Sequence, residues 1–140
     1  MPEHPGRYPG VLLPPRFFDV RYNGAAIPQD GRRDLSAGAN CQLFAYALLA
    51  ANGRNVPDFR SSELWADEAV TARISELEPL DLLLFHDKPD AYGAHIAVYL
   101  GRGEAIHLSK HEGRPVIWPL ERFAQEPRYA VFVGAKRVCS

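Results

Sequence analysis

The amino-acid sequence predicts an α+β domain in which a buried N-terminal helix packs on an antiparallel sheet of about five strands. Residues 39–53 read as one helix, since this stretch is rich in Ala and Leu and contains no charged side chain. After Pro79 the chain consists mainly of short apolar runs separated by turn residues, which is typical of strands. Helices that precede the strands, rather than alternate with them, favour an α+β domain over a series of βαβ units.

The composition narrows the class of protein. The 140 residues suit one domain with a substantial core, and 46% hydrophobic with 24% charged residues is typical of a globular protein. The formal net charge is −1 and no dense cluster of Lys and Arg occurs, which argues against nucleic acid or an anionic membrane surface as a partner. The two cysteines, Cys41 and Cys139, provide neither a disulfide framework nor the spacing of a metal motif.

The first 18 residues are predicted to form an extended arm rich in Pro and Gly, followed by a single domain over residues 19–140. Four apolar side chains would order this arm by packing on the domain: Tyr8, Leu12, Phe17 and Phe18. The uninterrupted apolar stretch of a signal peptide is missing, and no segment is long enough to span a bilayer. We therefore expect a cytoplasmic protein with reduced thiols, with non-classical export as the alternative.

The helix over residues 41–52 begins with a chemically distinctive residue. Asn40 is a good N-cap, and Gly53 is the residue type that most often follows a helix end. Cys41 lies in the first turn, where free backbone N–H groups and the positive end of the helix dipole stabilise a thiolate. An isolated cysteine is more often a buried apolar filler, so a nucleophile is favoured only if the chain also supplies a base.

The remaining elements follow in order along the chain. Residues 61–67 begin a second, short helix that one of two serines, Ser61 or Ser62, would cap, with a helical tendency up to Ala72. A helical turn is expected over residues 120–124. Five strands are predicted from the apolar runs: 82–86, 95–100, 104–108, 116–118 and 129–133. A Gly-Arg-Gly turn joins the second and third of these strands into a hairpin.

The chain contains five histidines, of which three fall in predicted strands. His4 lies in the arm and His111 in a loop, so neither is a candidate for the base; His86 is a strand residue without a partner in the pattern. His107 follows His95 by twelve residues across the predicted hairpin, so the two rings can lie on one face of the sheet. The second ring would then fix the tautomer of the first. A single strand histidine is more often a half-buried structural residue, and it is the pair that favours a site.

Five stretches of the sequence resemble the NlpC-like cysteine peptidases, a papain-like bacterial family best known for cutting cell-wall peptides. The resemblance covers roughly residues 19–125, with the stretches in the family's order. They correspond to the nucleophile helix, a Pro-x-x-Arg-x-Ser segment, the start of a central strand, the strand that carries the base and the strand that carries the third residue: 39–44 with Gly53, 56–62, 77–85, 94–101 and 105–109.

This resemblance implies a papain-like fold and a cysteine hydrolase, that is, a peptidase or amidase. The enzyme would cleave an amide bond in a peptidoglycan-type peptide or a related small peptide or amide, without metal or organic cofactor. Cys41 would be the nucleophile, His95 the general base and His107 the residue that orients it. Tyr22 best matches the tyrosine that the family places upstream of the cysteine, where it lines the site and assists the backbone N–H of Cys41 at the oxyanion.

The sequence departs from the family pattern around the nucleophile and at one strand. Asn40 replaces the usual Asp, a change that keeps the cap, since Asn and Asp cap about equally well. Gln42 and Leu43 replace the common Ser-Gly, which alters the wall of the pocket, and Leu80 replaces a glycine at the start of the central strand. We expect a conserved type of catalytic core with a changed substrate pocket.

The expected mechanism begins with a thiolate–imidazolium pair, in which His95 and the helix dipole lower the pKa of the Cys41 thiol. Three alternatives stay open at this point. The same chemistry would serve an acyltransferase or amidase of cytosolic metabolism. A papain-like domain with a changed pocket would also bind peptides without cutting them. Finally, Cys41, His95 and His107 are residue types that hold catalytic zinc, although their spacing matches no metal motif.

Overall fold

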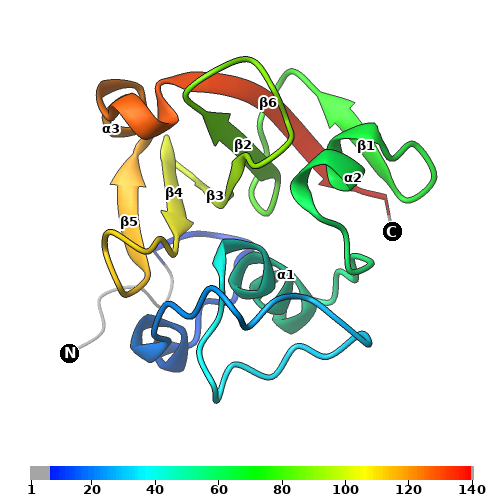
Figure 1. Cartoon of the computed structure of the whole chain (residues 1–140), viewed down its shortest axis with the longest axis vertical. Coiled ribbons are helices and arrows are strands. Elements are labelled where there is room, and N and C mark those ends of the chain that lie inside the picture. The colour runs from blue at the N-terminus through cyan, green and yellow to red at the C-terminus, as the bar shows by residue number, and fades with distance from the viewer. Residues whose placement is uncertain (1–6, 140) are drawn as a thin grey trace.

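The computed structural model of the chain describes residues 7–139 (Figure 1), so His4 and the first six residues of the predicted arm lie outside the described part. Three α-helices, two short 3-10 helices and six strands follow one another along these residues. In chain order they are η1 (Pro15–Asp19), α1 (Cys41–Ala51), α2 (Ser61–Ala66), β1 (Thr71–Ile74), β2 (Leu82–His86), β3 (His95–Gly101), β4 (Glu104–His107), β5 (Val116–Pro119), α3 (Leu120–Gln125), η2 (Pro127–Tyr129) and β6 (Val131–Val138).

The six strands form one antiparallel sheet in the order β1-β6-β2-β3-β4-β5. Five of them correspond to the predicted strands, and the sixth is β1, which the sequence pattern assigned in part to a helix reaching Ala72. The helix ends earlier because the Asp67 carboxylate accepts the backbone N–H groups of Val70 and Thr71, at 3.0 and 2.8 Å. The turn made in this way directs the chain into pairing with β6.

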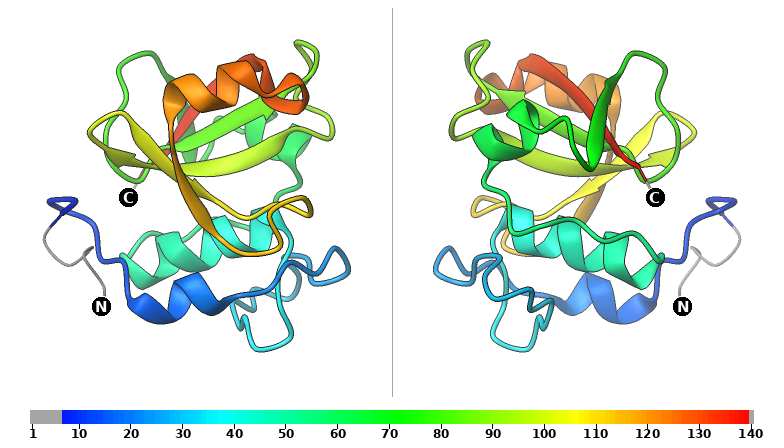
Figure 2. Two further views of the ribbon diagram at one scale, coloured as in Figure 1. Left: turned by 90° about the vertical axis from the view of Figure 1, so that its left-hand side faces the viewer. Right: turned by 90° about the vertical axis from the view of Figure 1, so that its right-hand side faces the viewer.

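The sheet lies between two helical layers (Figure 2): α1 covers one face, and the short α3 covers the other. Successive residues of β2 serve the two layers in turn, since Leu82 and Leu84 belong to the core under α1 whereas Leu83 and Phe85 belong to the core under α3. Both faces of this central strand are therefore buried, which explains its uninterrupted apolar sequence.

Among residues 7–139 no helix is long and apolar enough to cross a bilayer.

Helix α1 has the ends that the sequence predicts. The Asn40 side chain accepts the backbone N–H of Leu43 at 2.8 Å, and Gly53 has the left-handed backbone, with φ of +78°, that terminates a helix. Helix α2 is capped differently from the prediction, because Ser61 is its first helical residue and is buried. The Glu63 carboxylate accepts the backbone N–H of Arg60 at 2.7 Å and fixes this helix start instead.

The described part of the predicted arm is only partly extended, because residues 15–19 form the 3-10 helix η1, with a proline in its first turn. Tyr8 and Phe17 are buried in the core under α1, as expected, and Phe18 packs against it. Leu12 is exposed to 64%, and its neighbour Leu13 takes the buried position. The arm therefore contributes side chains to the core of the domain that it precedes.

The last strand is displaced along the sequence from its predicted place. The pattern predicts a strand over residues 129–133, whereas β6 spans residues 131–138 and Tyr129 belongs to the 3-10 helix η2. Strand β6 also approaches α2 closely, since a Cβ atom at Gly134 would lie 2.3 Å from the Cη2 atom of Trp65. Glycine is the residue that permits this contact.

Candidate active site

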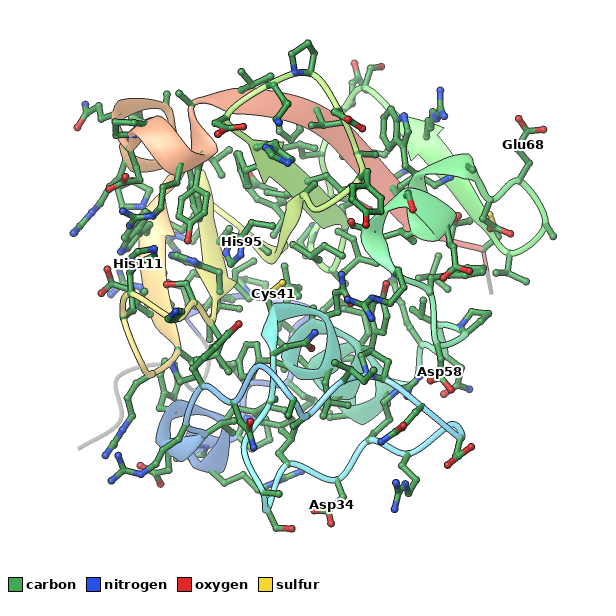
Figure 3. All side chains as sticks on the ribbon, in the orientation of Figure 1. Asp34, Cys41, Asp58, Glu68, His95 and His111 are labelled. Carbon is green, nitrogen blue, oxygen red and sulfur yellow. The ribbon has the colours of Figure 1, made fainter. Side chains whose placement is uncertain are left out.

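A cleft of about 310 Å³ opens between three parts of the chain: the start of α1, the start of β3 and the segment that follows β4. Figure 3 shows Cys41 at the first turn of α1 and His95 on the sheet directly above it, both turned toward this space. The side chains and backbone that line the cleft come from six separate segments: Tyr22, Cys41, Phe85, His86, Asp87, Gly93, His95, Leu108, Ser109, Lys110, His111, Arg128 and Tyr129.

Cys41 is the first residue of α1 and is half-buried. The Asn40 side chain accepts the N–H of Leu43, the third residue of the helix. The N–H groups of the first two residues, Cys41 and Gln42, therefore stay free of this cap at the end of the helix that borders the cleft. Burial raises the pKa of the Cys41 thiol, while backbone N–H groups of Ile96, Cys41 and Gln42 act against this by stabilising the thiolate. Burial is the larger influence. This direction is opposite to the lowered pKa that the position at a helix start suggests.

The two strand histidines meet as their spacing predicts. The Nε2 atom of His95 lies 2.9 Å from the Nδ1 atom of His107, and the ring planes are inclined at 83°. The β3–β4 hairpin brings them together. Continued by one residue, the register of the Val98–Ile106 pair places His107 opposite Ala97, which is two residues from His95 and on the same face of β3. His107 is fully buried, whereas His95 is half-buried and reaches the cleft. His107 therefore supports His95 from the interior, while the Nδ1 atom of His95 is the ring nitrogen left for the cleft.

Both histidines are held in the neutral form. Burial lowers the pKa of His95 to about 3, with a smaller contribution from the positive charge of Arg128. Burial also lowers the pKa of His107 to about 2, and His95 and Arg122 add to this shift. With the pKa of the thiol raised as well, burial favours a neutral thiol beside a neutral imidazole. These directions disfavour the thiolate–imidazolium pair that the sequence predicts.

An aromatic cluster that the sequence analysis did not identify surrounds the two imidazoles. The Tyr129 ring stacks on His95 with a centroid distance of 4.5 Å and an angle of 18°. Trp118 and Phe123 contact His107 at centroid distances of 4.4 and 4.7 Å. Trp118 comes from β5, Phe123 from α3 and Tyr129 from η2. A sequence signal exists only in retrospect, as three aromatic residues within the twelve positions 118–129, the first of them eleven residues after His107.

Tyr22 lines the cleft as expected from the resemblance. Its segment is fixed by a bridge to Ala39, the residue before the Asn40 cap, and by its own N–H group, which donates to the Gly113 carbonyl at 2.9 Å. Burial raises the pKa of the Tyr22 hydroxyl, and the neighbouring Cys41 adds to this shift. The hydroxyl therefore keeps its proton and can act as a hydrogen-bond donor.

Two other histidines also border the cleft. His86 is held by its neighbours, since its Nδ1 atom lies 2.7 Å from the Asp87 carboxylate and its Nε2 atom 3.1 Å from the Tyr92 carbonyl oxygen. His111, which the sequence analysis excludes as a loop residue, is exposed at the rim beside Lys110. Among residues 7–139 no three His, Cys, Asp or Glu side chains are arranged to hold a metal ion.

The chain has relatives among known proteins. The model of the NlpC/P60 family matches residues 22–130 of the chain. A curated relative, the gamma-D-glutamyl-L-lysine dipeptidyl-peptidase of Bacillus cereus, is 30% identical over 101 residues, which cover 71% of this chain and 29% of the relative. The chain thus spans less than a third of the length of this relative.

Three solved structures resemble the chain. An NlpC/P60 family protein from Bacillus cereus has 25% sequence identity and a TM-score of 0.56, with 74% of this chain and 32% of that chain covered. An NLP/P60 family protein from Staphylococcus aureus, described as similar to lipoprotein, has 21% identity and a TM-score of 0.61, with coverages of 89% and 38%. The peptidoglycan hydrolase RipB from Mycobacterium tuberculosis has 21% identity and a TM-score of 0.59, with coverages of 89% and 60%. The last two share the fold with this chain.

Proposed function

Because this chain belongs to the NlpC/P60 family, we propose that it is a cysteine hydrolase that cleaves an amide bond in a peptide through an acyl-enzyme on Cys41. The arrangement around His95 carries the proposal. Its ring lies in the cleft above the nucleophile, and its other nitrogen is 2.9 Å from a fully buried partner, His107. A nucleophile, a base and a group that orients the base form the arrangement that such chemistry needs.

The reaction starts from the neutral thiol and imidazole. As the Cys41 sulfur bonds to the carbonyl carbon, the thiol proton passes to Nδ1 of His95, and the carbonyl π electrons move to the oxygen. The backbone N–H of Cys41, together with the Tyr22 hydroxyl, would donate to this oxyanion. Collapse of the intermediate breaks the carbon–nitrogen bond, and His95 protonates the leaving amine. Water then hydrolyses the thioester, giving the carboxylic acid and restoring the thiol.

The neutral resting state gives His95 a defined task. An uncharged imidazole can accept the thiol proton, and the imidazolium that forms is stabilised by its contact with His107. The imidazolium exists only while negative charge develops on the substrate, so the burial that disfavours it at rest is offset in the transition state. We therefore assign His95 as general base and then general acid, and His107 as a positioning residue.

The rim of the cleft favours a substrate with a carboxylate. Two cationic side chains line it, Lys110 and Arg128, against one acidic residue, Asp87. Arg128 also pairs with Glu126 at 3.1 Å, so Lys110 is the less compensated cation. The name of the curated relative specifies a gamma-D-glutamyl bond, and a glutamyl group linked through its side chain retains its α-carboxylate. We therefore propose peptides with this type of linkage as the first substrate class.

The test is turnover of a peptide that contains a gamma-D-glutamyl-L-lysine bond, followed by mass spectrometry of the released amine. Replacing Cys41 by alanine should lower the rate by about 10⁴-fold or more, because it removes the nucleophile. Cys139→Ala is the matched control, since this second cysteine is exposed near the C-terminus and should leave the rate unchanged. Full activity of Cys41→Ala would overturn the proposal.

The same assay separates the alternative functions. A product that forms only when an acceptor amine is added would identify acyl transfer instead of hydrolysis. Peptide binding without turnover, and without an acyl adduct on Cys41, would identify a peptide-binding domain. His107→Ala should retain part of the wild-type rate, since a residue that orients the base does not itself react with the substrate.

A further inference from the structure

One ring nitrogen in the site has no polar partner. Among residues 7–139 the Nε2 atom of His107 is one of two buried side-chain nitrogen or oxygen atoms without a hydrogen bond, the other being Oε1 of Gln42. His107 has no exposed surface, so water does not satisfy this atom from the cleft side. Buried polar atoms are nearly always paired, and an exception at a candidate site calls for a physical explanation.

The hydrogen bond between the two histidines admits two arrangements when both rings are neutral. In the first, Nε2–H of His95 donates to Nδ1 of His107, so His107 carries its proton on Nε2 and His95 has a free lone pair on Nδ1. In the second, Nδ1–H of His107 donates to Nε2 of His95, so His95 carries its proton on Nδ1. Only the first arrangement leaves His95 able to accept a proton from the thiol.

The surroundings of His107 distinguish these arrangements. The edge-to-face contact with Trp118 has a centroid distance of 4.4 Å and an angle of 70°, and Phe123 lies at 4.7 Å with an angle of 56°. An aromatic face is negative, so it attracts an N–H group and repels a nitrogen lone pair. For a buried ring nitrogen that has no hydrogen-bond partner and belongs to an imidazole in contact with two aromatic rings, a proton is therefore favoured over a lone pair.

Other contacts hold the two aromatic rings in these positions. The Arg122 guanidinium lies 4.3 Å from the centroid of the Trp118 ring, and Phe85 stacks on Phe123 at 4.3 Å with an angle of 4°. Each ring thus has one face occupied by another group. The positive charge of Arg122 near His107 further opposes a second proton on this imidazole.

We propose that Trp118 and Phe123 are positioning residues that enclose Nε2–H of His107 and thereby select the tautomer in which Nδ1 of His95 is the base. The proposal rests on the proposed function only for its catalytic consequence. The proton positions themselves are properties of the resting protein, so they can be measured without a substrate.

The experiment is ¹⁵N NMR of the histidine side chains in the resting wild-type protein and in Phe123→Leu. In the wild type we expect both His95 and His107 to carry their proton on Nε2, and the His107 proton to be shifted by the aromatic ring currents. Phe123→Leu removes one ring face and should populate the second arrangement. With an active substrate its kcat should fall roughly twofold to fivefold at nearly constant KM, as expected for a weak contact worth about 0.5–1 kcal/mol.

Phe132→Leu is the matched control, because this aromatic residue contacts Phe85 at 5.4 Å and is half exposed. It should leave both tautomers and kcat unchanged, and Phe123→Tyr, which keeps the ring face, should behave like the wild type. Wild-type spectra with the His107 proton on Nδ1 would overturn the proposal, whatever the variants do. Unchanged tautomers in folded Phe123→Leu and Trp118→Leu would also overturn it.

These outcomes are separate from the failure of the proposed function. Suppose that the protein cleaves no peptide but has the expected tautomers, and that Phe123→Leu changes them. The proposal for Trp118 and Phe123 would then stand, and the proposed function would be wrong.

Discussion

Two groups of buried polar side chains lie against the same sheet, at opposite ends of it. At the β1–β6 end, the Asp81 carboxylate accepts two hydrogen bonds from the Arg137 guanidinium, at 2.8 and 2.9 Å, and one from the Glu78 N–H, at 2.7 Å. Lys136, the residue before Arg137 in β6, is buried, and its ammonium group donates to the carbonyl oxygens of Trp65 and Asp67. Each of these three charged side chains thus has at least two hydrogen bonds.

The histidine pair at the β3–β4 end differs in its hydrogen bonding and in its access to a cleft. Its two rings share one hydrogen bond, the buried Nε2 atom of His107 has no hydrogen-bond partner among the described residues, and His95 opens onto a cleft. Complete matching fixes a structure, whereas a polar group left free in a cleft is available for chemistry. The comparison therefore assigns the Asp81 end to the framework and the histidine end to the reaction, and it can be tested from either side.

The largest expected effect is on stability at the framework end. Asp81→Ala leaves the Arg137 guanidinium without its buried partner and should lower the free energy of unfolding by about 3 kcal/mol, measured by urea denaturation. Glu78→Gln is the control, since this exposed carboxylate lies 3.4 Å from the same arginine and should change stability by less than about 0.5 kcal/mol. The folded Asp81→Ala protein should keep the wild-type kcat. A parallel loss of kcat would remove the distinction between the two ends.

The next effect is a pH dependence that belongs to the histidine end. The pKa of His107 is about 2 in the folded protein, below the ordinary value of about 6.5 in an unfolded chain. Between these values the unfolded state binds more protons, so stability present above about pH 6.5 is lost as the pH falls. Between pH 7 and pH 5 this histidine should account for a loss of about 2 kcal/mol in the free energy of unfolding.

Urea denaturation at the two pH values measures this contribution. His107→Asn should lose about 2 kcal/mol less than the wild type over the same interval, because it removes the group that titrates. His111→Asn, a change at the exposed rim, should keep the wild-type difference between the two pH values. Equal pH dependence in His107→Asn and the wild type would mean that the buried ring does not stay neutral.

Much of the histidine end can be predicted from the sequence, but less of the framework end can. The reason is physical. Helix α1 has its own cap and an uncharged sequence, and a tight hairpin joins the two histidine strands, so local signals are sufficient. Strands β1 and β6 pair across more than sixty residues, as in Thr71 with Val138. The charged Lys136 and Arg137 fit into β6 only because distant groups bind them, which no local pattern records.

Within the site, the positions of the candidate residues could be predicted but their surroundings could not. Cys41, His95, His107 and Tyr22 all border the cleft or support it, as the spacing and the resemblance indicate. The thiol pKa depends on burial, which results from packing of separate segments, and it moves opposite to the expectation from the helix start alone. The stacking of Tyr129 on His95 likewise depends on where a loop returns to the sheet.

The smallest effect is a difference in stability between two variants of Leu80, the residue that precedes Asp81. Leu80 has a φ of +78°, a left-handed conformation that favours glycine, at the position where the resembled family has glycine. Its side chain is buried at 3% exposure, so both Leu80→Ala and Leu80→Gly should destabilise by about 2–4 kcal/mol. Leu80→Gly should nevertheless be the more stable of the two by about 0.5–1 kcal/mol, because only glycine relieves the backbone strain.

Leu82, two residues later in β2 and fully buried, provides the matched pair for this comparison. Its backbone is an ordinary strand, so Leu82→Ala should be more stable than Leu82→Gly by about 0.5–1 kcal/mol, the reverse of the order at position 80. Urea denaturation of the four variants gives both differences. The same order at both positions would show that the left-handed turn stores no strain. The reversal would mean that the backbone at Leu80 is strained, and that this strain is offset by the burial of the leucine side chain.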